Sequence, residues 1–149
     1  GSFPLCEGIK QRGQGFRVLF QFLDRMHKEH ALTEIVHEQV VQKRTDKREK
    51  LVALYGLVAV VELFGASRGI VPVPYDSGQW RMSAFSTEER KAIKGRDWKQ
   101  PAIDRCRQLG FDPKDGDEAE AILILDHHLI VGRVISKWRA ENPFLCTVA

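Results

Sequence analysis

Four acidic residues lie within six positions of the sequence, directly before an apolar run. They are Asp115, Asp117, Glu118 and Glu120, and the run begins at Ala121. Acidic side chains near a helix N-terminus cap free N–H groups and oppose the positive end of the helix dipole. One or two acids suffice for that, whereas three or four repel one another unless a cation lies among them. The cluster therefore has two interpretations, helix capping and half of a divalent-metal site.

A further acid, Glu38, lies inside the apolar segment IVHEQVV. Side chains alternate between the two faces of a strand, so Glu38 shares a face with Val36 and Val40. A buried carboxylate is costly unless it is paired or bound to a metal. Glu38 is therefore either an edge residue paired with a nearby Lys or Arg, or a residue at the end of a strand that faces a site.

The elements that must position these acids alternate between strand and helix. Apolar residues at helical spacing predict the helices, and short segments rich in β-branched residues predict the strands. Strands are predicted at 2–6, 34–41 and 70–76, and helices at 16–29, about 50–65, 101–110 and from the acidic cluster towards Trp138. Residues 81–99 are predicted to form a loop with one short helix. This alternation indicates an α/β domain.

Composition limits the class of protein. A chain of 149 residues with 43% hydrophobic content predicts one compact domain over residues 1–149. The net charge of +3 permits a polyanionic partner without requiring one. Three cysteines without metal-ligand spacing indicate reduced thiols in a cytoplasmic protein, and exclude a disulfide framework or a zinc site. The apolar stretch 51–65 is short for a membrane span and carries Glu62, so we expect a buried core helix and no membrane.

Several segments together resemble RuvC-type Holliday junction resolvases, which are ribonuclease H-like nucleases. In order along the chain, the segments are IVHEQV, ALYGLVAVVELFGASRGI, VPVPYDSGQW, KAIKGRDWK and DEAEAIL. Each motif is common by itself, and their order and spacing over roughly residues 30–130 carry the resemblance. The resemblance implies a ribonuclease H-like mixed sheet flanked by helices.

The resemblance also implies a metal site. Glu38 matches the second metal-binding carboxylate of the family, and Asp117 and Glu120 match the pair on its last helix. Residues three apart lie on one helix face, one turn from each other. Acidic oxygen ligands suit Mg²⁺ or Mn²⁺, and no small-molecule cofactor is expected. In the family, two ions at a separation of ~4 Å flank the scissile phosphate.

Basic residues are expected to contact the DNA. Lys91 and Lys99 resemble the lysines that approach the cleaved strand in the family. A second group of basic residues would contact DNA phosphates farther from the cleavage point. These residues are Lys43, Arg44, Lys47 and Arg48. Alternatively, each of these side chains is a solvated surface residue. The adjacent His127 and His128 are interpreted as packing or surface residues rather than as parts of the site.

Two features depart from the family pattern. Glu120 is at a position where the family usually has Asp. The longer side chain of Glu would shift a bound metal ion or loosen its coordination geometry. The family's first catalytic Asp lies on an opening strand, for which this sequence has no counterpart, since Glu7 has a different setting. The fold is therefore expected to be incomplete at its N-terminus. A fragment, a degraded relative and a strand supplied by a partner chain are three explanations, of which we favour the first.

We therefore expect a metal-dependent endonuclease that resolves branched DNA, such as four-way junctions, during recombination or repair. The alternative from another class is a catalytically inactive ribonuclease H-like module that binds nucleic acid or protein. A different nuclease or transposase of the same fold is a third hypothesis.

The long apolar helix predicts self-association. Between about 51 and 64, apolar residues occur almost all the way round, whereas a helix packed on a sheet needs one apolar face. Two symmetric nicks on a junction require two sites related by a twofold axis. We therefore expect a homodimer whose interface includes part of this helix, with packing on the last helix of the same chain as the alternative.

Overall fold

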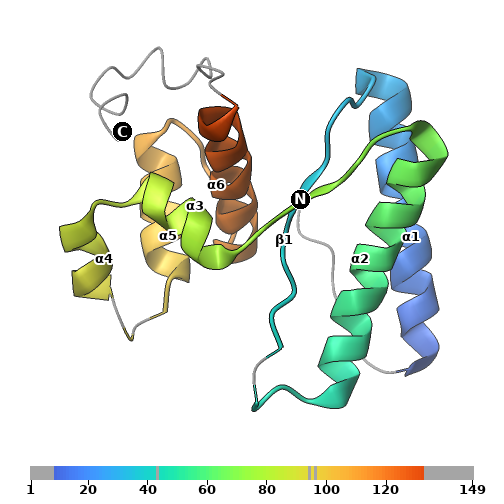
Figure 1. The fold of residues 1–149 in the computed structure, drawn as a ribbon, viewed down its shortest axis with the longest axis horizontal. Coiled ribbons are helices and arrows are strands. Elements are labelled where there is room, and N and C mark those ends of the chain that lie inside the picture. Colours follow the sequence, from blue (N-terminus) through green and yellow to red (C-terminus); the bar gives the residue numbers. More distant parts are fainter. Residues whose placement is uncertain (1–8, 43, 94, 96, 133–149) are drawn as a thin grey trace. The chain divides into compact units, whose positions relative to one another are not determined.

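The computed structural model describes residues 9–42, 44–93, 95 and 97–132 (Figure 1). Contacts divide the chain into two compact units, an N-terminal unit that ends at Pro74 and a C-terminal unit that begins at Tyr75. The described ranges contain six helices and a small parallel sheet of two strands, so the chain is mixed α/β and mostly helical. The single domain over residues 1–149 stays a prediction, and each unit is treated by itself.

Two long helices, α1 (Ile9–His30) and α2 (Arg48–Arg68), pack against each other in the N-terminal unit (Figure 1). The Phe16 ring lies so close to Gly56 that any side chain there would overlap it. Farther along, the rings of Phe20 and Phe64 meet edge to face, with their centroids 5.6 Å apart. Phe64 is fully buried, so these aromatic contacts form the centre of the interface between the two helices.

The two strands, β1 (Val36–Glu38) and β2 (Val73–Tyr75), are joined through α2. Parallel strands need such a crossover connection, which α2 provides. The N–H of Val73 donates to the carbonyl oxygen of Ile35, at 2.9 Å. Both strands are shorter than the predicted 34–41 and 70–76, because prolines on either side of Val73 have no N–H to donate.

Four helices make up the described part of the C-terminal unit. They are α3 (Ser77–Ala84), α4 (Thr87–Ile93), α5 (Lys99–Gln108) and α6 (Gly116–Val131). Helix α6 packs against both α3 and α5. The core between them contains Trp80, Ala84, Ala102, Cys106, Ala119, Leu123 and Ile124. Burial raises the pKa of the Cys106 thiol to about 12, which keeps it protonated and unreactive at neutral pH.

The predicted helices at 16–29, 50–65 and 101–110 are present with shifted ends, and the last helix begins at the acidic cluster as predicted. The short helix predicted within 81–99 is present as α4, whereas α3, which begins at Ser77 and ends at Ala84, was not predicted. Reciprocal capping begins each of them, between Asp76 and Gln79 and between Ser86 and Glu89. The predicted strand at 2–6 and Trp138 lie outside the described residues.

The expectation that the long apolar helix is a buried core helix is wrong for the described structure. In α2, the buried residues are Phe64 and Gly65, while Val52, Tyr55 and Leu63 are 47%, 50% and 64% exposed. Helix α1 covers one face of α2, so apolar residues on the other faces keep their exposure. The whole helix α2 is longer than the apolar stretch 51–65 and is long and apolar enough to cross a membrane, although a single helix of this kind is weak evidence for a membrane.

Candidate functional site

Two of the four clustered acids cap α6. The Asp115 carboxylate accepts a hydrogen bond from the N–H of Glu118, at 2.8 Å. The Glu118 carboxylate accepts in turn from the N–H of Lys114, also at 2.8 Å. The capping interpretation of the cluster is thus confirmed for Asp115. Asp117 also lies in the first turn of α6, where its charge opposes the positive end of the helix dipole, and Glu120 follows it three residues later.

A lysine from the start of α5 lies beside these two acids. The Lys99 ammonium nitrogen is 3.2 Å from an Asp117 carboxylate oxygen, and the two side chains are 53% and 70% exposed. The hydrogen bond to Asp117 and the charge of Asp117 raise the pKa of Lys99, and the charges of Asp97 and Glu120 raise it further. The structure therefore pairs Lys99 of α5 with Asp117 of α6, two of the residues predicted for the site, and the charge of Glu120 also acts on Lys99.

Lys99, Asp117 and Glu120 do not by themselves make a metal site. Asp117 and Glu120 carry carboxylate oxygens one helical turn apart, and the Lys99 ammonium already lies beside Asp117. Among the residues that the structure describes, no group of three or more His, Cys, Asp or Glu side chains could hold a metal ion. Glu38 ends β1 in the N-terminal unit and is exposed. A metal site shared by Glu38, Asp117 and Glu120 stays a prediction.

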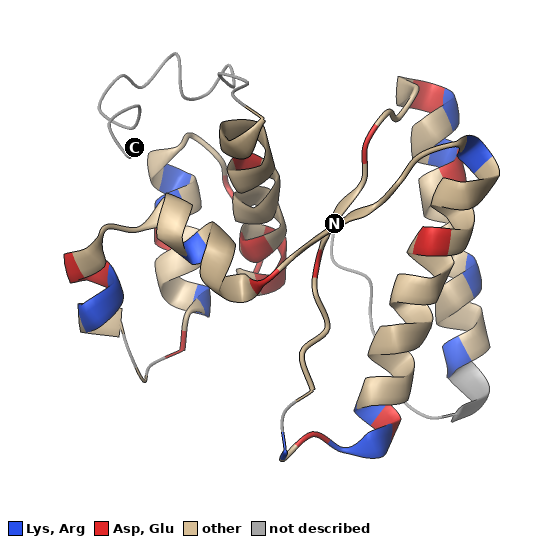
Figure 2. Cartoon of the chain, in the orientation of Figure 1, with Lys and Arg blue, Asp and Glu red and all other residues tan. Residues whose placement is uncertain are grey.

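The remaining basic residues predicted to contact DNA lie on the surface. Arg44, Lys47 and Arg48 are exposed before and at the first turn of α2, where Figure 2 shows basic and acidic residues side by side. Lys91 is exposed on α4, and Lys43 lies outside the described residues. Lys99 and Lys91 thus belong to one unit and the segment around Arg44 to the other. Their role in DNA binding stays a prediction.

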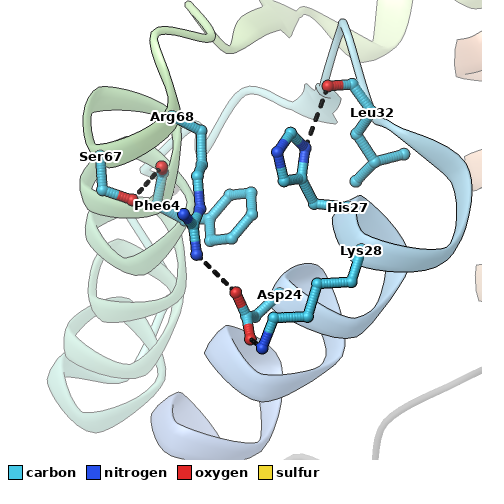
Figure 3. Close-up of polar contacts among 7 residues, drawn as sticks. All are labelled: Asp24, His27, Lys28, Leu32, Phe64, Ser67 and Arg68. Atoms are coloured by element: carbon cyan, nitrogen blue, oxygen red, sulfur yellow. Dashed lines mark hydrogen bonds and ion pairs between the residues drawn. The ribbon is translucent and has the colours of Figure 1, made fainter.

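Sequence reasoning missed a polar cluster that ties the ends of α1 and α2 together (Figure 3). The Asp24 carboxylate binds both Lys28 and Arg68, each at 2.6 Å. The hydrogen bond from Lys28 is the largest cause that lowers the pKa of Asp24. The Arg68 guanidinium also lies over the Phe64 ring, 5.9 Å from its centroid. Because Asp24 and Arg68 are 44 residues apart, no local signal in the sequence pairs them.

A second cluster joins α6 to α3 and to the end of β2. His127 is 7% exposed, and its Nδ1 lies 2.6 Å from the Ser83 hydroxyl. The Nδ1 of His128 lies 2.8 Å from the Tyr75 hydroxyl, whose ring meets His127 edge to face. Both histidines are thus hydrogen-bonded packing residues, as predicted. The adjacent Asp126 is also buried, at 1% exposure.

The burial of His127 predicts a stability that falls in mild acid. Desolvation by burial is the largest effect on the pKa of His127 and lowers it. The charge of Asp126 raises this pKa, and the charge of His128 lowers it further. As pH falls through about 6.5, the unfolded state binds a proton that the folded state does not, so the free energy of unfolding decreases until the lower folded pKa is reached. Melting temperatures between pH 8 and pH 5 should show this slope, reduced in His127→Asn. An equal slope in His127→Asn would contradict it, and His30→Asn on the exposed end of α1 is the control.

Comparisons of the chain with models of protein families, with curated proteins and with solved structures find no match. The site is therefore interpreted from its own residues, and the resemblance to RuvC-type resolvases stays a prediction.

Proposed function

We propose that the chain is a ribonuclease H-like, metal-dependent endonuclease that cuts branched DNA such as four-way junctions. The observation that carries the proposal is the meeting of α5 and α6, where Lys99 lies 3.2 Å from Asp117 and Glu120 follows one turn later. Carboxylates bind Mg²⁺, and an ammonium group binds phosphate. A metal-dependent nuclease that draws its phosphate to an ammonium group would use both kinds of group at one place.

The strand–helix–strand unit supports the ribonuclease H-like part of the proposal. Parallel strands β1 and β2 flank α2 in the chain, and Glu38 is the last residue of β1. In open α/β sheets, ligands bind outside the carboxyl ends of the strands. The position of Glu38 at the end of β1 supports a ligand site of this kind in the proposal.

In this proposal, Glu38, Asp117 and Glu120 hold Mg²⁺, or Mn²⁺ in its place. The bound ions supply an activated water and stabilise the leaving oxygen of the phosphate. The three carboxylates orient the ions, while Lys99 attracts the phosphate of the strand to be cut. The other basic residues, Lys43, Arg44, Lys47, Arg48 and Lys91, contact phosphates farther along the DNA.

A salt titration of junction binding tests this set of basic residues. Affinity for a synthetic four-way junction should fall steeply with salt, because each phosphate contact releases a counterion. The double variant Lys47→Gln/Arg48→Gln should flatten the slope of log affinity against log salt by about 1.8, since each contact contributes about 0.9. The matched control is Arg17→Gln/Lys114→Gln, which neutralises two exposed basic residues outside the predicted set. An affinity independent of salt would point to a protein partner instead.

Cleavage assays separate this proposal from its rivals. Mg²⁺-dependent nicking of a four-way junction, in preference to flaps and duplex of the same sequence, supports a resolvase. Equal cutting of all three substrates would indicate another nuclease of the same fold. Junction binding without nicking under any divalent metal would favour the inactive binding module.

We also propose that the nuclease is cytoplasmic and acts as a homodimer. Two symmetric nicks require two sites related by a twofold axis. Helix α2 exposes Val52, Tyr55 and Leu63, which are apolar residues that a second copy of the chain would cover. Sedimentation of a monomer at tens of micromolar would contradict the dimer.

A further inference from the structure

We propose that Arg81, held over the rings of Trp80 and Trp98, is a further residue of the C-terminal unit that binds a DNA phosphate. Arg81 lies on α3, and Trp98 lies directly before α5. The inference rests on the proposed function, because DNA is the source of the phosphate. It adds a basic residue to those that the sequence predicted to contact DNA.

Two aromatic rings hold the Arg81 side chain. Its guanidinium carbon lies 5.0 Å from the centroid of the Trp80 ring and 4.6 Å from that of the Trp98 ring. Trp80 is fully buried, and Trp98 packs edge to face on the buried Phe85, so packing holds both rings in place. A guanidinium is attracted to the face of an aromatic ring. Arg81 is therefore oriented before a ligand binds, which reduces the entropy that binding costs.

The guanidinium of Arg81 makes no polar contact within the described part of the chain. Its Nε atom is enclosed and has no hydrogen-bond partner among the described residues. No residue that the structure describes forms a hydrogen bond or an ion pair with the two terminal nitrogens, Nη1 and Nη2. Contacts with ring faces use the charge of the guanidinium and leave its in-plane N–H groups to other partners. A ligand with two acceptor oxygens would therefore complete the hydrogen bonding of the terminal nitrogens.

Two other arginines of the C-terminal unit, Arg90 and Arg105, contact the same aromatic cluster and have protein partners. The Nη1 of Arg90 donates to the carbonyl oxygen of Phe85 at 2.8 Å, and Arg105 binds the Glu89 carboxylate. The Arg105 guanidinium also lies over the Phe85 ring, 5.1 Å from its centroid. Arg81 differs from both because no described residue accepts a hydrogen bond from it. Three guanidiniums with one bound carboxylate leave an excess of positive charge, which favours an anion.

Nearby basic residues favour a DNA phosphate over another anion. A planar guanidinium can donate two parallel N–H bonds to a phosphate or to a carboxylate. Lys91 is exposed on α4, and Lys99 follows Trp98 at the start of α5, so Arg81 extends a set of cations already proposed to contact DNA. The acid that precedes Trp98 is Asp97, which accepts a hydrogen bond from the N–H of Lys99 at 3.1 Å.

Covering the two tryptophan rings does not by itself require an arginine. A methionine has a long, flexible side chain that packs on apolar surface and makes favourable contacts between its sulfur and aromatic rings. It would not enclose a polar atom, whereas the Nε of Arg81 is enclosed without a partner among the described residues, which costs free energy. A charged ligand explains why a guanidinium occupies this position.

Junction binding by Arg81→Met tests the inference. The variant keeps a side chain that covers the rings and removes the charge and the N–H groups. Fluorescence anisotropy of a labelled four-way junction, without divalent metal, should show binding about tenfold weaker, the lower end of the range for a hydrogen bond to a charged group. The slope of log affinity against log salt should flatten by about 0.9, since one phosphate contact is lost.

The matched control is Arg107→Met on α5. Arg107 is exposed and lies 3.8 Å from Asp112, outside the residues assigned to DNA. This variant should leave both the junction affinity and the salt slope unchanged. Circular dichroism and melting temperatures check that each variant is folded. If Arg81→Met does not fold, Arg81→Lys replaces it, and this variant should also bind the junction less tightly, because an ammonium lacks the two parallel donors.

Trp98→Leu tests whether the ring positions Arg81. It should weaken junction binding less than Arg81→Met does, because the guanidinium remains but is held less firmly. The double variant Arg81→Met/Trp98→Leu should bind no more weakly than Arg81→Met alone. Additive losses would overturn the positioning role of Trp98.

The outcomes separate this inference from the proposed function. Equal affinity and salt slope in the unsubstituted and Arg81→Met chains, with nicking retained, would overturn the inference and leave the nuclease standing. Weaker binding by Arg81→Met, without nicking by the unsubstituted chain under any divalent metal, would support the phosphate contact and contradict the nuclease. A loss confined to a poly-glutamate peptide would overturn DNA as the partner, and no junction binding by the unsubstituted chain would overturn both proposals.

Discussion

Asp117→Asn is expected to reduce Mg²⁺-dependent nicking of a four-way junction by about 100-fold or more. A metal ion contributes several kcal/mol to stabilising the charge of the transition state, and each 1.36 kcal/mol is tenfold in rate. The substitution keeps the size of the side chain and removes its charge. Junction binding should be retained or strengthened, because a negative charge near the phosphates is lost and Lys99 is released from its ion pair.

The matched control for this prediction is Asp112→Asn. Asp112 is 93% exposed and lies 3.8 Å from Arg107, so it carries a comparable surface ion pair outside the proposed site. Rates are compared by gel electrophoresis of a labelled junction, and melting temperatures of both variants should match that of the unsubstituted chain. An Asp117→Asn chain that nicks as fast as the Asp112→Asn chain would remove Asp117 from the catalytic site.

Trp80→Ala should lower the free energy of unfolding of the C-terminal unit by about 3–5 kcal/mol, as expected for a large buried aromatic residue. Trp80 is fully buried on α3, which packs against α6. The Arg81 guanidinium lies 5.0 Å from the centroid of its ring and would lose this partner. Urea unfolding followed by circular dichroism measures the loss.

Two further substitutions on α3 serve as controls for the Trp80→Ala prediction. Met82→Ala should change the free energy of unfolding by less than about 0.5 kcal/mol, because Met82 is 56% exposed. Trp80→Phe should cost less than Trp80→Ala, since the indole N–H has no hydrogen-bond partner in the described part of the chain. If Trp80→Ala behaved like Met82→Ala, α3 would not be held against α6 through this residue.

Local features of the sequence were enough to locate most of the helices and part of the site. Asp115 precedes the last helix, and its carboxylate reaches an N–H only three residues ahead, so the capping contact depends on neighbours in the chain. The spacing of Asp117 and Glu120 puts them on one face of a helix for the same reason. Hydrophobic periodicity located α1, apolar composition located α2, and Pro101 and Gly110 located α5, with errors at the helix ends.

Tertiary packing decided the features whose partners are far apart in the sequence. Lys99 meets Asp117 because α5 packs on α6 through Gly116, a contact that no spacing rule predicts. In the same way, Asp24 of α1 binds Arg68 of α2, which is 44 residues away in the sequence. The strands are shorter than their β-branched segments, because strand length depends on available partners as well as on propensity.

Helix α2 shows most clearly which features the sequence determines and which depend on tertiary packing. Its apolar composition was read from the sequence, and composition alone suggested a buried core helix. Burial depends on which elements cover each face, and α1 covers one of them. The sequence therefore determined that α2 is a long apolar helix, whereas only the tertiary structure decided that Val52, Tyr55 and Leu63 stay exposed, because coverage is a property of packing between segments distant in the chain.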